Sequence, residues 1–377
     1  MSKRSVLYGS YILFLSIFTV FIGVKPYYGV DMLFYMAIIL EMDGETSVEQ
    51  VHRTVYQEAE STAGFRRYRD LVAASDYRRA LAADEVAFGE QIPFYVIKPL
   101  YLALAFLGYK VGAGLLFAAV LPCLLAYFAI GVLLLYWIDR QLPSPWLVVW
   151  VSVAIVTSEP LVDLGKSVSP DALSTVLLLA GAYFFIEGQS LRRSTLFFAL
   201  AILARPDAII LITLFFLIVA VGKWHRSVFW PQLLLCFLLC LGSYYVPRLF
   251  LEHVSWSTLF YHAFVDRLLY PLSEPQSVAI HDYWTVLAHQ AVHSTYVART
   301  SLLMITFFAG VVCWNQGNFF RWKTWTFDQT LMVVLVVAIA LRFMLFPAFL
   351  GRFMAPFLVL SAIVFIKEAY RVYTNRT

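Results

Sequence analysis

Long apolar runs recur from one end of the chain to the other, and they constrain its fold more than any other feature. The first run, residues 6–24, is about 19 residues long, which suits an α-helix that crosses a bilayer. Of the 377 residues, 61% are hydrophobic and only 14% are charged, against about 25% charged residues in soluble proteins. We therefore expect an all-α, polytopic membrane protein with a single integral-membrane domain over residues 1–377. No small-residue cleavage site follows the first run, so we expect that helix to be retained.

The charge and the missing motifs argue against several function classes. The formal net charge of +4 comes mostly from Lys and Arg at the ends of apolar runs, which gives no support for a nucleic-acid partner. The chain has neither a Walker A sequence nor a dinucleotide fingerprint, so nucleotide hydrolysis and hydride transfer have no support. The four cysteines lie inside apolar runs, at Cys123, Cys236, Cys240 and Cys313, and we expect no disulfide.

The apolar runs predict about ten membrane-spanning helices with both termini in the cytoplasm. These helices cover residues 6–24, 111–137, 145–158, 171–187, 194–204, 207–222, 229–250, 298–314, 328–346 and 353–367. Every short inner loop is then basic, as the positive-inside rule requires. The residues concerned are Lys3, Arg4, Arg140, Arg192, Arg193, Lys223, Arg226, Arg321, Lys323, Lys367 and Arg371. The apolar stretch 94–107 is short and contains Lys98 and Pro99, so we expect an interfacial or re-entrant helix there.

Two long loops then lie on the outer face, at residues 25–110 and 251–297. Thr46-Ser47-Val48-Glu49 predicts a capped helix start, followed by apolar residues at helical spacing. A second amphipathic stretch, rich in arginine, begins at Phe65. We expect these amphipathic helices to lie on the membrane surface, with arginines facing lipid phosphates. Simple anchoring and a role in substrate gating both remain open.

Asp31 is the residue most suggestive of chemistry. It lies a few positions beyond the outer end of the first apolar run. A carboxylate so close to an apolar boundary loses hydration, which costs free energy. A charged residue in such an unfavourable position indicates a functional role. Alternatively, Asp31 caps a helix or pairs locally.

Further charged residues fall in the short outer loops and turns. They are Asp163, Lys166 and Asp171 in and after the loop 158–170, Arg205 in the turn 204–207, and Arg352 in the turn 347–352. Structural alternatives exist: the loop charges pair with each other, Asp171 favours a helix N-terminus, and Arg205 pairs with Asp207. Arg342 lies within an apolar run and needs either an aqueous cavity or a partner.

The order and sidedness of several motifs resemble the GT-C superfamily of integral-membrane glycosyltransferases. The motifs are a long first outer loop that opens with Asp31 and ends in Ile92-Pro93-Phe94-Tyr95-Val96-Ile97, an outer Ser169-Pro170-Asp171-Ala172-Leu173, an Ala204-Arg205-Pro206-Asp207 turn, and Gly351-Arg352-Phe353-Met354-Ala355-Pro356. The resemblance covers most of the chain. Two features depart from it: Met32 follows Asp31 where many members have a second acid, and no large soluble domain follows the last helix.

The resemblance implies a glycosyltransferase of the cytoplasmic (inner) membrane, with an active site that faces the periplasm or exterior. Its donor would be a sugar on a polyprenyl-phosphate carrier held among membrane lipids, and its acceptor a glycan, lipid or protein. An inverting transfer needs a general base on the acceptor hydroxyl and cations for the leaving phosphate.

Each candidate residue then has an expected role. Asp31 would be the base, with Glu41 and Glu45 as alternatives. Lys166, Arg205 and Arg352 would bind the donor phosphate, and Arg352 suits this best because guanidinium forks bidentately onto phosphate oxygens. Asp163 would orient an acceptor or hold a divalent cation, and Asp171 would also bind substrate.

Two other functions remain as alternatives. An O-antigen polymerase or ligase also uses lipid-linked glycans, but typically has its largest loop late in the chain. A transporter or flippase predicts ionisable residues at mid-membrane depth and repeat symmetry, whereas here the charges collect at one face and no repeat is visible.

Overall fold

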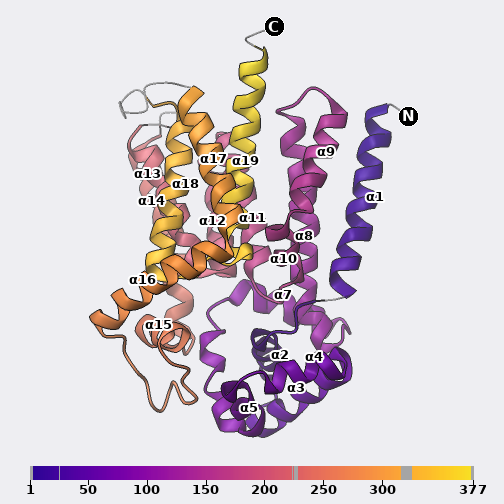
Figure 1. Ribbon diagram of the computed structural model, residues 1–377, viewed down its shortest axis with the longest axis vertical. Coiled ribbons are helices and arrows are strands. Elements are labelled where there is room, and N and C mark those ends of the chain that lie inside the picture. The colour runs from indigo at the N-terminus through magenta and orange to yellow at the C-terminus, as the bar shows by residue number, and fades with distance from the viewer. Residues whose placement is uncertain (1–2, 25, 223, 225–227, 316–324, 375–377) are drawn as a thin grey trace.

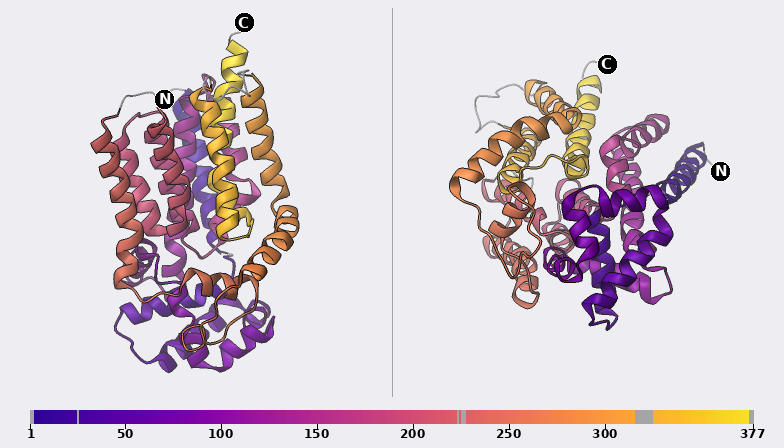
Figure 2. Two further views of the ribbon diagram at one scale, coloured as in Figure 1. Left: turned by 90° about the vertical axis from the view of Figure 1, so that its left-hand side faces the viewer. Right: turned by 60° about the horizontal axis from the view of Figure 1, so that its bottom comes forward.

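A computed structural model describes residues 3–24, 26–222, 224, 228–315 and 325–374, apart from the side chains of residues 294, 295 and 315. Within these residues the chain is helical and forms no strand, which confirms the all-α prediction. Figure 1 shows an upright bundle of helices above a layer of short ones. The first helix begins and the last helix ends at the end of the bundle away from that layer (Figures 1 and 2). Lys25, Lys223, Arg226, Arg321 and Lys323, which the predicted loops include, lie outside the described residues.

The bundle contains a helix for each of the ten predicted apolar runs. These helices are α1 (Lys3–Val24), α8 (Leu115–Asp139), α9 (Pro145–Val156), α11 (Asp171–Ile186), α12 (Leu191–Ala204), α13 (Ile209–Ala220), α14 (Trp230–Phe250), α17 (Arg299–Asn315), α18 (Phe327–Leu345) and α19 (Gly351–Thr374). Five of the described helices, α1, α8, α14, α18 and α19, are long and apolar enough to cross a membrane. A sixth span results if α9 and α10 (Glu159–Lys166), which meet at 59°, count as one. The fold is that of a membrane-embedded protein, and ten spans stays a prediction.

The first predicted outer loop is almost entirely helical. It contains α2 (Val30–Met42), α3 (Val48–Ala63), α4 (Phe65–Ala73), α5 (Asp76–Ala83), α6 (Glu85–Gly89), the 3₁₀ helix η1 (Ile92–Phe94) and α7 (Pro99–Lys110). The helix predicted to start there is α3, but its N-cap is Ser47, not Thr46, and the Ser47 side chain accepts the backbone N–H of Gln50. α7 has 12 residues and packs against α8.

α2 is buried inside the molecule. Every residue from 32 to 40 is at most 9% exposed. The helix is apolar on all sides and packs against α3, α7 and α8, as expected for a helix with no solvent face. Asp31 is the second residue of α2, so this packing fixes its position where the layer meets the bundle.

The second predicted outer loop joins the same layer and contains α15 (Trp256–Phe264) and α16 (Ile280–Val297). The buried Gln91 side chain donates from Nε2 to the carbonyls of Leu268 and Leu269, at 3.1 and 2.9 Å. Tyr270 also donates its hydroxyl to Asp84, at 2.6 Å. These hydrogen bonds hold segments about 180 residues apart in the sequence together, so the two predicted loops form one layer.

Candidate functional site

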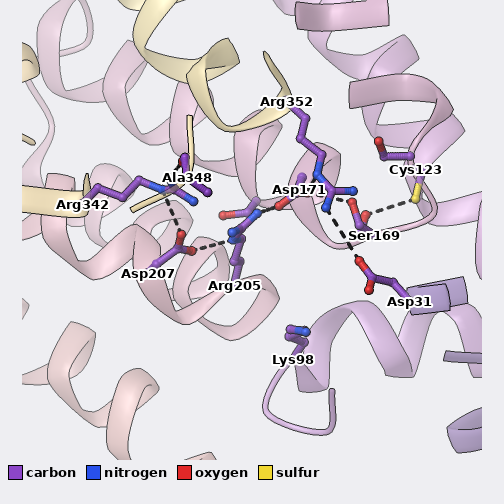
Figure 3. A network of polar contacts seen from close by, with 12 residues as sticks. Asp31, Lys98, Cys123, Ser169, Asp171, Arg205, Asp207, Arg342, Ala348 and Arg352 are labelled. Atoms are coloured by element: carbon purple, nitrogen blue, oxygen red, sulfur yellow. Dashed lines mark hydrogen bonds and ion pairs between the residues drawn. The ribbon is translucent and has the colours of Figure 1, made fainter. Parts of the chain in front are cut away.

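Six charged side chains alternate in sign where the bundle meets the layer of short helices (Figure 3). We call them the ion-pair network: Asp31, Arg352, Asp171, Arg205, Asp207 and Arg342. Arg352 Nη2 lies 3.7 Å from Asp31 Oδ2, and its Nε lies 3.1 Å from Asp171 Oδ2. Arg205 pairs with Asp171 and, at 2.6 Å, with Asp207 Oδ1. Arg342 Nε closes the series at 3.2 Å from Asp207 Oδ2.

The members of the network come from the ends of different helices. Asp31 and Asp171 lie in the first turns of α2 and α11, where their negative charge complements the helix dipole. Arg205 and Asp207 flank Pro206 in the short break between α12 and α13. Arg342 lies in the last turn of α18 and Arg352 in the first turn of α19, just after the loop that joins these helices. Short connections at one end of the bundle therefore bring distant residues together.

Asp171 is the most buried charge of the network, with 3% of its side chain exposed. A buried carboxylate is costly unless it is paired and hydrogen-bonded. Two arginines and the Ser169 hydroxyl, which donates to Asp171 Oδ2 at 2.8 Å, meet that requirement. The Cys123 thiol in turn contacts the Ser169 carbonyl, with Sγ 3.2 Å from the oxygen (Figure 3).

Phe353 holds the three arginines close to one another. The guanidinium carbons of Arg342, Arg205 and Arg352 lie 4.0, 4.3 and 5.2 Å from the centroid of its ring. The face of an aromatic ring attracts cations, so it offsets part of the repulsion among these like charges.

An open pocket beside Phe353 is lined by all three arginines, and we call it the arginine pocket. It has about 450 Å³ of empty space, which includes solvent at its mouth. Asp171 and Asp207 also line it, together with apolar side chains from α11, α13 and α19, namely Leu178, Ile210, Leu211, Pro356 and Phe357. Arg342 is 6% exposed, and its buried Nη2 has no hydrogen-bond partner among the described residues. The pocket therefore combines an unused cationic donor with apolar walls.

A second pocket lies on the Asp31 side of Arg352, and we call it the carboxylate pocket. It has about 290 Å³ of empty space and is lined by Tyr27, Gly29, Asp31, Met32, Ser167, Val168 and Arg352. The Asp31 side chain is 43% exposed, so a ligand can reach it. Arg352 lines both pockets and lies between them.

Lys98 lies close to Asp31 (Figure 3) among tyrosines. Its Nζ donates to the Tyr35 hydroxyl at 3.0 Å and lies 4.6 Å from the centroid of the Tyr95 ring. Tyr95 donates its own hydroxyl to Asp31 Oδ1 at 2.8 Å. Burial lowers the pKa of Lys98 to about 7, because it disfavours the charged ammonium.

Four of the six predicted site residues meet in the network: Asp31, Asp171, Arg205 and Arg352. The other two, Asp163 and Lys166, lie on α10 beside Tyr27. Asp163 Oδ1 accepts the Tyr27 hydroxyl at 2.9 Å, and Lys166 Nζ lies 5.6 Å from the Tyr27 ring centroid. Since Tyr27 lines the carboxylate pocket, these two residues lie next to that pocket, outside the ion-pair network.

Several residues of the site carry no predicted role from sequence. Arg342 was expected to need a cavity or a partner, and it has both, the arginine pocket and Asp207. Lys98, like Arg342, is a charged residue inside an apolar stretch, and such a residue indicates that a partner or a cavity is present. Tyr95 lies within the quoted motif Ile92–Ile97, but the sequence gives it no role, because its contact with Asp31 spans 64 residues.

No group of three or more His, Cys, Asp or Glu side chains that could hold a metal ion occurs among the described residues. The candidate metal ligand Asp163 instead accepts a tyrosine hydroxyl. Comparisons with protein-family models, curated proteins and solved structures give no match to this chain.

Proposed function

We propose that this protein is a GT-C-like membrane glycosyltransferase with ten spanning helices and an active site on the outer face of the cytoplasmic membrane. It transfers a sugar from a polyprenyl-phosphate carrier to a glycan, lipid or protein acceptor. One observation carries the proposal: an accessible carboxylate, Asp31 Oδ2, lies 3.7 Å from an arginine, Arg352 Nη2, between two pockets at the boundary of the bundle. A base and a phosphate-binding cation side by side are what glycosyl transfer from a phosphate requires.

The arginine pocket suits the donor phosphate. Its lining includes three arginines and two aspartates, which leaves one positive charge in excess. A phosphodiester between a sugar and a lipid carries one negative charge, so the two are complementary. The unpartnered Nη2 of Arg342 offers a charge-assisted hydrogen bond, and the apolar walls suit the first carbons of a lipid tail.

The carboxylate pocket suits the acceptor. Asp31 Oδ2 takes the proton of an acceptor hydroxyl while the hydroxyl oxygen forms a bond to the anomeric carbon of the sugar. The bond from that carbon to the phosphate oxygen breaks, and its electron pair stays on the phosphate. Arg352 faces both pockets and stabilises the charge that develops there. Attack opposite the leaving phosphate inverts the anomeric centre.

Asp163 and Lys166 belong to the acceptor side in this proposal. They lie against Tyr27, whose side chain remains about half exposed at the carboxylate pocket. A polar and aromatic surface of this kind suits hydroxyl-rich acceptors. Lys166, expected to bind the donor phosphate, is therefore reassigned to the acceptor side within this proposal.

The test is sugar transfer from a purified polyprenyl-phosphate donor to acceptors in membranes that lack the enzyme. Asp31→Asn keeps the size of the side chain but removes the proton acceptor. We expect transfer to fall about 10²- to 10⁴-fold, the usual contribution of general base catalysis. Donor binding and protein yield change little, because a base acts mainly in the transition state.

Glu41→Gln and Glu45→Gln are the matched controls, since both carboxylates lie on or near α2. If Glu41→Gln or Glu45→Gln abolishes sugar transfer while Asp31→Asn remains active, that glutamate is the base. Near-normal transfer by all three variants would refute a carboxylate base in this layer and favour transport of a lipid-linked glycan.

A further inference from the structure

The two oxygens of the Asp31 carboxylate have different partners. Tyr95 donates its hydroxyl to Oδ1 at 2.8 Å, whereas Oδ2 faces Arg352 at 3.7 Å, too long for a direct hydrogen bond. Oδ1 is therefore fixed by a neutral donor, and Oδ2 retains the capacity to accept a proton. This asymmetry makes Oδ2 the reactive oxygen if Asp31 is a base.

Tyr95 is itself held by its neighbours. Its ring stacks on Phe34 with centroids 4.7 Å apart, and it meets the Tyr35 ring edge-on at 5.4 Å. Lys98 Nζ lies over the Tyr95 ring at 4.6 Å. A protonated amine over an aromatic face draws electron density from the ring, which makes the phenol a better hydrogen-bond donor.

We propose that Tyr95 and Lys98 are positioning residues for the base, in a relay in which protonated Lys98 polarises Tyr95 and Tyr95 holds Asp31 Oδ1. This inference rests on the proposed function, because it concerns the base of that reaction. The relay fixes the carboxylate so that Oδ2 points to the acceptor before the substrate arrives.

Lys98 does not line either pocket, so its position does not suit direct contact with substrate. The charged and titratable groups that influence it come from several elements. They are Asp31 and Tyr35 on α2, Tyr95 before α7, Arg205 and Asp207 between α12 and α13, and Arg352 on α19. Asp31 and Asp207 favour the protonated amine, while burial and the two arginines oppose it. The pKa of Lys98, lowered to about 7, makes its charge sensitive near neutral pH.

The first experiment measures transfer against pH for four variants. Tyr95→Phe keeps the ring under Lys98 but removes the hydroxyl. We expect kcat to fall about 10- to 100-fold, the range for a lost hydrogen bond to a charged group, with donor KM within about twofold. We expect the activity of the wild type to decline above about pH 7, and we expect Lys98→Met to lower kcat and to remove this decline. Lys98→Arg stays charged, so it restores much of the activity and also lacks that decline.

Tyr77→Phe is the matched control, because Tyr77 lies in the same layer but donates its hydroxyl to the neutral Gln91 side chain. We expect its kcat and pH profile to match the wild type. Normal kcat in Tyr95→Phe, or an unchanged alkaline decline in Lys98→Met, would overturn the relay while leaving Asp31 as base.

A second experiment needs no activity. The reactivity of Lys98 toward acetic anhydride, followed by mass spectrometry from pH 5 to 10, reports the fraction of deprotonated amine. We expect a midpoint near pH 7 that moves lower in Asp31→Asn, because the carboxylate no longer stabilises the ammonium. An unchanged midpoint would show that Lys98 and Asp31 are not coupled. Coupling in a protein that transfers no sugar would instead sink the glycosyltransferase proposal and the role of Asp31 as its base, while the physical coupling between Lys98 and Asp31 would stand.

Discussion

Each arginine of the site is already paired before any ligand binds. Arg205 contacts two carboxylates, Arg342 contacts Asp207, and Arg352 contacts Asp31 and Asp171. A buried cation without such a partner would be strongly destabilising. Under the proposed function, a donor phosphate would share these guanidinium groups with aspartates, and Arg342 Nη2, which has no hydrogen-bond partner among the described residues, would be available to it.

Replacement of Arg352 tests the donor site directly. Arg352→Ala should weaken binding of a polyprenyl-phosphate analogue by about 1.5–3 kcal/mol, the range for hydrogen bonds to charged groups. The fold tolerates the change, because Asp171 keeps Arg205 and Ser169 as partners. Arg352→Lys should recover only part of the affinity, since an ammonium cannot fork onto two oxygens. Native mass spectrometry of the purified protein with the analogue gives the affinities.

Arg193→Ala is the control, since Arg193 is exposed at the start of α12, at the other end of the bundle from the site. Arg342→Met tests the arginine pocket in the same assay and should also weaken binding. Unchanged affinity in both Arg352→Ala and Arg342→Met would remove the phosphate from this pocket.

Lys98 also makes stability depend on pH. Its pKa is about 7 in the folded protein and about 10.4 in an unfolded chain, so the unfolded state binds more protons between these values. Stability should therefore rise with pH between about 7 and 10, by at most about 1.4 kcal/mol per unit from this residue. In detergent, Lys98→Met should melt higher than the wild type at pH 7, with the gap closing toward pH 10. A gap that does not depend on pH would contradict the lowered pKa of the buried Lys98.

At the scale of elements, α15 depends on a neutral histidine. His262 is 7% exposed, packs on the rings of Tyr77 and Phe94, and accepts the backbone N–H of Leu268 at Nδ1. Burial lowers its pKa to about 4, below the usual value of about 6.5. Between these values the unfolded chain binds more protons, so stability should fall as pH drops from about 6.5 to 4.

His262→Asn tests this dependence, because an amide oxygen can accept the Leu268 N–H without titrating. The melting temperature of the wild type should drop more than that of His262→Asn between pH 7.5 and 5. His253→Asn is the control, since His253 is in the same predicted loop and its Nδ1 meets only the Leu251 carbonyl, two residues away. If the melting temperatures of His262→Asn and the wild type drop equally, the stability of the protein does not depend on His262 being neutral.

Apolar runs predicted the bundle helices well, because a lipid-facing or buried helix must be apolar over most of its length. The short helices of the layer below the bundle were harder to predict. α5 and α6 have eight and five residues, and such helices depend on tertiary packing rather than on propensity. In the site, Asp31, Asp171, Arg205 and Arg352 could be predicted because helix ends on one face must lie at a similar level. The pairing of Tyr95 and Lys98 with α2 depends on how the layer folds back, which no local pattern encodes.

At the scale of the whole molecule, the two pockets lie on either side of Arg352 and, apart from α19, are built from different elements. α11, α13, α18 and α19 line the arginine pocket, whereas α2, α19 and the segments around residues 27–29 and 167–168 line the carboxylate pocket. A lipid-linked donor and its acceptor can therefore approach Arg352 from different directions. The proposed function places the layer of short helices on the outer face of the membrane.

Cysteine accessibility tests this orientation. α11 starts in the site at Asp171, so Ser190, which follows its far end, lies at the end of the bundle away from the outer layer. Glu60 is exposed on α3, within that layer. In a background without the four native cysteines, Ser190→Cys should react with a membrane-impermeant thiol reagent only from the cytoplasm, and Glu60→Cys only from outside. Labelling of Ser190→Cys from outside would mean that the segment containing α7 crosses the membrane, which inverts every later loop. Labelling of Glu60→Cys from the cytoplasm would place the candidate site on the inner face. That result would contradict the proposed active site on the outer face.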